Sequence, residues 1–147
     1  MYIRKAEPKD ACRIAEILVF NNRINFWPIF GDDGYSFGEL QVLSVSKEYQ
    51  DPNNLTGTYV YDDGIVRGMI RFDGEEIQKL YVDHFFQSRG IGAELLSFAV
   101  ENGGRRLWAL EKNVRGIAFY QRHGFEPNGE WIYEEGTTER LIRMVKR

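Results

Sequence analysis

The stretch that decides the fold is Gln87-Ser88-Arg89-Gly90-Ile91-Gly92-Ala93, a glycine-containing turn between two regular elements. Residues 76–82 before it are typical of a strand, and residues 91–102 after it have the apolar spacing of a helix. A turn that opens a helix leaves backbone N–H groups unpaired at the positive end of the helix dipole. Glycine at 90 and 92 would let a ligand approach that backbone closely. The turn therefore predicts a site for a phosphorylated cofactor, and a plain steric turn is the alternative.

The chain before this turn begins with a short strand and ends with three consecutive strands. Residues 2–5 are the first strand, and Asp10 is expected to cap a helix with apolar positions at Ala11, Ile14, Ala15 and Leu18. An irregular, aromatic-rich segment follows over 21–38, and a second helix is expected over 37–49. Strands over 56–61, 65–72 and 75–82 are separated by turn signals at 62–64 and 73–74.

The strand that leads into the turn has an irregular apolar pattern. Ile77 falls at an odd position, whereas Leu80 and Val82 fall at even positions, so a regular strand would send them to opposite faces. Either both faces are buried or a β-bulge between Gln78 and Tyr81 shifts the alternation. We favour the bulge.

The chain after the turn alternates helix and strand before a final hairpin. The helix over 91–102 stops at Gly103-Gly104, residues 106–110 form a strand, and Asn113 is expected to cap a helix that reaches about residue 122. Residues 130–134 and 140–145 form the hairpin, turning at Gly136. This order predicts a single α/β domain over 1–147, with a mixed, mostly antiparallel sheet and helices on both faces.

Composition excludes several classes of function. The 147 residues are 43% hydrophobic and 14% aromatic, as expected of a folded globule, and the formal charge of −3 gives no footprint for nucleic acid or an anionic membrane. The single cysteine excludes an intrachain disulfide, and His84 and His123 have no ligand-spaced neighbours, so no metal is expected. No apolar leader or membrane-length run is visible, and a cytoplasmic location is expected.

The motif Gln87-x-x-Gly90-x-Gly92-Ala93 after a fourth strand resembles the GCN5-related N-acetyltransferase (GNAT) family. A second segment, Asn113-Val114-Arg115-Gly116-Ile117-Ala118-Phe119-Tyr120-Gln121-Arg122-His123-Gly124-Phe125, is similar to that family's Asn-x-x-Ala-x-x-Phe-Tyr-x-x-x-Gly-Phe helix. Gly116 departs from the usual alanine and costs the helix up to about 1 kcal/mol. The resemblance implies the GNAT fold, in which a bulged fourth strand splays from its neighbour.

The resemblance implies acetyl-CoA as the cosubstrate, with its pyrophosphate on the turn and its pantetheine arm along the fourth strand. The cofactor-binding residues that it implies are Leu80, Tyr81, Val82, Gln87, Ser88, Arg89, Gly90, Ile91, Gly92, Ala93, Asn113 and Tyr120. Tyr120 is the expected general acid toward the departing thiolate, and its alternative is a packed aromatic. Glu76 is the expected base, directly or through water, with Glu75 as the neighbour that could replace it. Cys12 on the first helix is expected to be a buried small residue, and its alternative is a nucleophile that carries the acetyl group.

The acceptor is expected to be an amine, on a small molecule or a peptide, and Trp27, Phe30 and Tyr35 are the candidate residues of its site. Their alternative is that they fill a core beneath the segment. The function predicted is acetyl transfer to a primary amine by direct attack in a ternary complex. A non-catalytic acyl-CoA-binding module is the main alternative, and a nucleotide-binding protein is disfavoured because no Gly-Lys-Ser/Thr follows the glycines. The final hairpin offers an edge at which two copies could form a homodimer.

Overall fold

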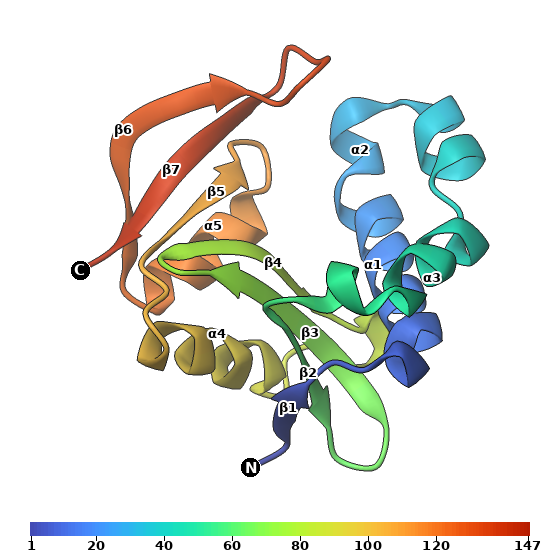
Figure 1. Cartoon of the computed structure of the whole chain (residues 1–147). Helices are drawn as coiled ribbons and strands as arrows, with labels where there is room; N and C mark the ends of the chain where they lie inside the picture. The colour runs from blue at the N-terminus through green and yellow to red at the C-terminus, as the bar shows by residue number, and fades with distance from the viewer.

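The structure is a computed structural model that describes residues 1–147. Its centre is one seven-stranded sheet with the strand order β1-β2-β3-β4-β5-β7-β6, in which β4 and β5 are parallel and every other neighbouring pair is antiparallel (Figure 1). The strands are β1 (Ile3–Lys5), β2 (Thr58–Asp62), β3 (Val66–Asp73), β4 (Glu76–Val82), β5 (Arg106–Leu110), β6 (Phe125–Tyr133) and β7 (Arg140–Lys146). The predicted mixed, mostly antiparallel sheet is confirmed.

Helices cover both faces of the sheet, each over its own core. The α-helices are α1 (Ala11–Asn25), α2 (Trp27–Phe30), α3 (Val42–Gln50), α4 (Ile91–Glu101) and α5 (Val114–Arg122), and shorter turns are η1 (Pro8–Asp10), the π-helical η2 (Gly34–Glu39), η3 (Pro52–Leu55) and η4 (His84–Phe86). One core joins α1 and α3 to β2 and β3, and the other joins α4 to the opposite face. None of the helices combines the length and the apolar character needed to cross a lipid bilayer.

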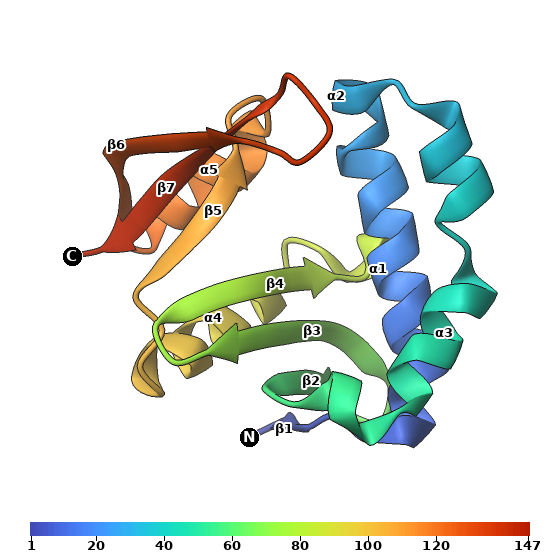
Figure 2. The same cartoon turned by 45° about the horizontal axis from the view of Figure 1, so that its top comes forward.

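Strand β4 carries the predicted bulge and parts from β5. Arg71 pairs with Lys79 and Phe72 with Ile77, so Gln78 is the extra residue, at the beginning of the predicted interval. The shift puts Ile77, Leu80 and Val82 on the α4 side, whereas Tyr81 packs against the core of α1 and α3. Pairing between β4 and β5 ends after Ile77 and Leu107, and beyond this point the two strands diverge (Figure 2).

The segment predicted to be irregular is mostly helical. Helix α1 continues to Asn25, and α2 follows within two residues, with Gly31 in the left-handed region (φ 64°) at its end. The helix expected over 37–49 instead begins at Val42, because residues 34–39 form the wider turn η2. Apolar spacing alone did not distinguish α2 and η2 from a loop, because their aromatic residues do not lie on one side of either element.

Three other local predictions are wrong. The Asp10 carboxylate makes no cap bond to α1 and instead accepts from Arg4 and from the backbone N–H of Glu7. Cys12, expected to be buried, is exposed. The last hairpin begins at Phe125 rather than residue 130, because the register shift between Pro127 and Trp131 hides its period. Strand β6 is an edge of the sheet, and its Trp131, Ile132 and Tyr133 are exposed.

Candidate active site

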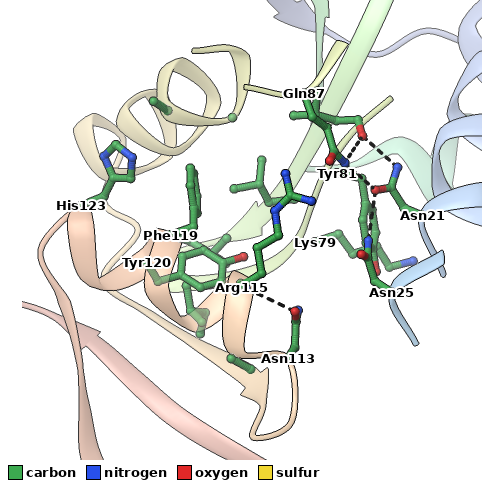
Figure 3. Close-up of a pocket in the computed structure, with 18 of the residues that line it drawn as sticks. Asn21, Asn25, Lys79, Tyr81, Gln87, Asn113, Arg115, Phe119, Tyr120 and His123 are labelled. Carbon is green, nitrogen blue, oxygen red and sulfur yellow. Dashed lines mark hydrogen bonds between the residues drawn. The ribbon is translucent and has the colours of Figure 1, made fainter. Parts of the chain in front are cut away.

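A cavity of about 560 Å³ lies where β4 and β5 part. Its lining comes from the end of α1, both diverging strands, the turn before α4 and the inner side of α5 (Figure 3). Lys79, Arg115 and Arg122 are among the lining residues, whereas no aspartate or glutamate is. A cavity with cations and without carboxylates is suited to a ligand that carries negative charge.

The turn at 87–93 has the geometry of an anion cradle. Ser88 (φ 63°) and Gly90 (φ 83°) both adopt left-handed backbone, and Ser88 is the only residue other than glycine with positive φ. None of the backbone N–H groups from Gln87 to Ala93 donates a hydrogen bond within the protein; the first donor of the helix is Glu94, to the Gly90 carbonyl. These free donors lie at the N-terminus of α4, where the helix dipole favours an anion.

Of the two glycines in the turn, only Gly90 is required by its backbone conformation. Nothing lies within 4 Å of a Cβ built on Gly90, so the space in front of the turn is open and the positive φ is what requires glycine. A Cβ on Gly92 would lie 3.4 Å from the Phe119 ring, an ordinary van der Waals distance, so packing against α5 does not by itself require glycine at this position.

A buried amide network ties the turn to β4 and α1. Asn21, which is 3% exposed, donates to the carbonyls of Ile17 at 2.8 Å and Val82 at 2.9 Å. The Gln87 amide donates to the same Val82 carbonyl and to Asn21 Oδ1, both at 3.3 Å (Figure 3). The Gln87 side chain therefore positions the turn from inside.

Strand β4 offers unpaired backbone groups to the cavity. The Asp83 N–H donates to the Arg67 carbonyl, so Arg67 and Asp83 are a hydrogen-bonded pair of β3 and β4. Hydrogen-bonded pairs alternate along an antiparallel ladder, so Tyr81 and Lys79 also bond to β3, whereas Val82 and Leu80 do not. The N–H and C=O groups of Leu80 and Val82 consequently face away from β3, toward the space that β5 has left. The Val82 carbonyl already accepts from Asn21 and Gln87, so the unpaired groups are the N–H and C=O of Leu80 and the N–H of Val82. An extended ligand placed there could pair with them as a strand would.

Two tyrosines face the cavity from opposite walls. Burial alone raises the pKa of Tyr120 to about 12, and its hydroxyl has no hydrogen-bond partner in the protein. Burial also raises the pKa of Tyr81, with smaller contributions from Tyr120, Tyr49, Tyr35 and Glu134. Both phenols are therefore uncharged at neutral pH, and the free hydroxyl of Tyr120 is a proton donor inside the cavity.

Asn113 begins α5 as predicted. Its Oδ1 accepts from the Gly116 N–H at 3.2 Å, while its amide nitrogen is left to the cavity. The Arg115 side chain extends into the space between Tyr120 and Tyr81 and makes no ion pair, since every carboxylate lies more than 4 Å away (Figure 3).

Most of the implied cofactor residues line the cavity together, but the predicted base does not. Those in the lining are Leu80, Tyr81, Val82, Gln87, Ser88, Gly90, Ile91, Gly92, Ala93, Asn113 and Tyr120. The Arg89 side chain lies outside it and packs on Phe86, with the guanidinium carbon 5.5 Å from the ring centroid. Glu76 also lies outside, because Arg143 and Arg106 hold its carboxylate at the paired end of β4. Glu75 is exposed.

The aromatic residues expected at the acceptor site are not in the cavity lining either. Trp27 donates from its indole to Asp33 at 2.7 Å, and Phe30 lies at the end of the short α2. Tyr35 is 44% exposed in η2, near enough to Tyr81 to affect the pKa of that phenol. From this side of the molecule, the cavity is lined instead by Asn21 and Asn25 of α1 and by Phe26, the residue that follows it.

Sequence reasoning missed Lys79, Trp108, Arg115 and Phe119 as lining residues. The signal for Lys79 was present: beyond the bulge at Gln78, residues 79 and 81 share a face. Asn21 and Asn25 could not be found, because helical spacing did not extend α1 that far. No group of three or more His, Cys, Asp or Glu side chains is arranged to hold a metal ion.

The acetyltransferase (GNAT) domain family matches residues 54–127, half of the chain. The match includes the turn at 87–93 and the segment 113–125 that carries Tyr120. The chain belongs to this family. An uncharacterized N-acetyltransferase of Methanocaldococcus jannaschii is 40% identical over 78 residues, which are 49% of this chain and 31% of that relative. The chain therefore aligns with about a third of that relative's length.

Solved structures show the same fold over nearly the whole chain. The apo form of YjaB from Escherichia coli superposes with a TM-score of 0.78 at 16% identity, covering 97% of this chain and 95% of that one. The PaiA N-acetyltransferase from Thermoplasma acidophilum, in complex with coenzyme A, superposes with a TM-score of 0.70 at 20% identity, covering 99% and 98%. The fold is thus the single-domain GNAT α/β fold.

Proposed function

We propose that this protein is an N-acetyltransferase that transfers the acetyl group of acetyl-CoA to a primary amine by direct attack in a ternary complex. One observation carries the proposal: a cradle of unpaired N–H groups and a proton-bearing Tyr120 open into the same cavity. Family membership and the coenzyme A bound to the PaiA enzyme support the choice of cosubstrate.

The residues present fit acetyl-CoA. The free N–H groups at 87–93 suit its pyrophosphate, and the open space at Gly90 lets a phosphate reach the backbone. The N–H and C=O groups of Leu80 and the N–H of Val82 suit the amides of the pantetheine arm, and the Asn113 amide faces the same channel. Arg115 adds a cation beside that path. When bound, acetyl-CoA supplies an activated acetyl group and a thiolate leaving group.

Two parts of the chain would serve the chemistry. A backbone N–H of β4 would stabilise negative charge that develops on the carbonyl oxygen. Tyr120 would hold a proton at its phenolic oxygen for the departing sulfur. No carboxylate lines the cavity, so the amine would lose its proton to water rather than to Glu76. Direct attack needs no nucleophilic side chain, and the exposed Cys12 stays outside this scheme.

Two measurements test the proposal. Melting temperatures are recorded with acetyl-CoA, CoA, ATP and NAD, because a ligand that binds only the native state raises the melting temperature. Release of CoA thiol is then followed with a panel of primary amines. We expect stabilisation by the CoA compounds alone and thiol release with at least one amine. No stabilisation by any CoA compound at saturating concentration would contradict the proposal.

A non-catalytic acyl-CoA-binding module is the second candidate, and the absence of a carboxylate from the cavity lining favours it. It predicts the same stabilisation by CoA compounds but no thiol release with any amine. A small-molecule or peptide acceptor and a cytoplasmic location remain predictions. So does a homodimer through the edge strand β6, which light scattering would detect.

A further inference from the structure

We propose that the acceptor amine carries an acidic group, a carboxylate or a phosphate, which is held at Lys79. This inference rests on the proposed function and names its class of acceptor. Lys79 lines the cavity from β4, on the face that also carries Tyr81 and opposite the face packed by α4. Its side chain extends toward Asn25 of α1, away from the turn at 87–93 (Figure 3).

The Lys79 ammonium has no anionic partner. Its one hydrogen bond in the protein goes to the hydroxyl of Tyr49, at 3.0 Å, and no carboxylate oxygen lies within 4 Å. Tyr49 is 1% exposed, so it fixes the ammonium from the buried side, and the two other donors of the ammonium have no hydrogen-bond partner in the protein. A half-buried cation with free donors is suited to an anion.

The strand next to Lys79 adds a second positive charge. Arg71 lies directly opposite Lys79 in the register of β3 and β4, on the same face of the sheet. Arg71 also has no carboxylate within 4 Å, although it lies outside the cavity lining. Like charges directly opposite each other destabilise a sheet. A bound anion would reduce this repulsion, and no ion pair within the protein does so.

The nearest carboxylate on the same strand does not compensate. Glu76 is held by Arg143 at 2.9 Å and by Arg106 at 3.4 Å, so its charge is already neutralised. This end of the cavity therefore attracts an acidic acceptor and disfavours a purely cationic amine, such as a polyamine.

Matched pairs of amines test this charge preference. Wild-type protein and acetyl-CoA are assayed for thiol release with glycine against glycinamide and with phosphoethanolamine against ethanolamine, at equal concentrations of the unprotonated amine. We expect kcat/KM to be at least about tenfold higher for the acidic member of one pair, and the pair that shows it distinguishes carboxylate from phosphate. Equal or greater turnover of both neutral members would overturn the inference and leave the proposed function intact.

If no amine is turned over, the proposed function is contradicted, and the preference for an acidic group is then tested by binding. Calorimetry on the CoA-loaded protein compares N-acetylglycine with its amide, and N-acetyl phosphoethanolamine with N-acetyl ethanolamine. Tighter binding of an acid supports a site for an acidic group, and equal or weaker binding of both acids overturns it.

Variants assign the effect to Lys79. Lys79→Met keeps most of the apolar stem and is expected to raise KM for the acidic amine about tenfold, with little change for the neutral one. Lys79→Arg should retain the preference. Lys47→Met on α3 is the matched control, because Lys47 is exposed and forms no ion pair. An unchanged acid-to-neutral ratio in a folded Lys79→Met protein would overturn the assignment.

Discussion

Arg143 holds the Glu76 carboxylate, with its Nη1 atom 2.9 Å from each of the two carboxylate oxygens. The Arg143 guanidinium also lies 4.4 Å from the centre of the Trp108 ring, and its side chain is only 13% exposed. Glu76 thus joins β4 to β7 at the end where β4 and β5 still pair. We expect a carboxylate held in this way to stabilise the contact between the strands rather than to accept a proton from the amine.

Glu76→Gln should therefore affect stability more than turnover. We expect a loss of about 1 kcal/mol in the free energy of unfolding, since Glu76 is partly exposed, and a kcat/KM within about threefold of wild type. Thermal unfolding and the thiol-release assay measure the two effects. Glu75→Gln is the control, and both quantities should stay unchanged. A 100-fold loss of kcat/KM in a fully stable Glu76→Gln protein would restore Glu76 as the base.

Gly90→Ala should weaken cofactor binding. Gly90 has a φ of 83° in open space, so the substitution meets no atom but costs about 1 kcal/mol of backbone strain. Relaxation of that strain would turn N–H donors away from the ligand. We expect the Kd of CoA to rise about tenfold by calorimetry.

Gly64→Ala is the matched control for Gly90→Ala. Gly64 has a φ of 111°, also in open space, on the hairpin between β2 and β3. It should lower the melting temperature to a similar degree and leave the affinity for CoA unchanged. Equal affinity in both variants would contradict a role of the turn at 87–93 in cofactor binding.

The sheet and the turn were predictable because their signals are local. Period-two apolar patterns bounded by Asp-Gly turns identify β2, β3 and β4, and the broken period at Ile77 identifies the bulge. The helices over 21–50 were not predictable to the same degree. Some of their apolar residues join the core beneath α1 and others are exposed, so the spacing of apolar residues does not mark one buried face of each helix.

The part of the cavity that we propose for the cofactor was accessible from the sequence, whereas the part that we propose for the acceptor was not. Turn and helix N-terminus are adjacent in the chain, and backbone donors need no particular side chain. The proposed acceptor part joins Asn25 of α1, Lys79 of β4 and Trp108 of β5, which only the tertiary fold brings together. The ion pair of Glu76 was not predictable, because a strand pattern gives the face of a carboxylate but not its partner on β7.

Gly116→Ala should separate helix stability from the position of Asn113. A Cβ at residue 116 would lie 2.5 Å from the Asn113 side-chain nitrogen, so that side chain would have to leave its place. The lost cap costs about 1 kcal/mol, and alanine returns a similar amount in helix propensity. We expect an unchanged melting temperature with weaker binding of CoA by calorimetry.

Ala118→Gly on the same helix serves as the comparison for Gly116→Ala. It should lower the melting temperature through propensity alone and leave the Kd of CoA as it is, because Ala118 does not line the cavity. If Gly116→Ala binds CoA as well as wild type does, Asn113 makes no contact that matters to the cofactor.

Tyr120→Phe should slow turnover without weakening cofactor binding. The substitution removes only the hydroxyl, which has no hydrogen-bond partner in the protein, so the free energy of unfolding should hardly change. Loss of a positioned proton donor is expected to lower kcat about 100-fold. Tyr2→Phe is the control, since Tyr2 is 54% exposed beside β1. A kcat within about threefold of wild type would remove Tyr120 from the chemistry.

The pH dependence gives a second measure of the same role. Burial disfavours the phenolate and raises the pKa of Tyr120 to about 12, so the phenol keeps its proton throughout the range from pH 7 to 10. The acceptor amine, in contrast, loses its proton as the pH rises. For wild type, kcat/KM should increase toward pH 10 with no alkaline decline. A decline near pH 9 that Tyr120→Phe abolishes would show that the Tyr120 phenol ionises in that range, against this assignment of its pKa.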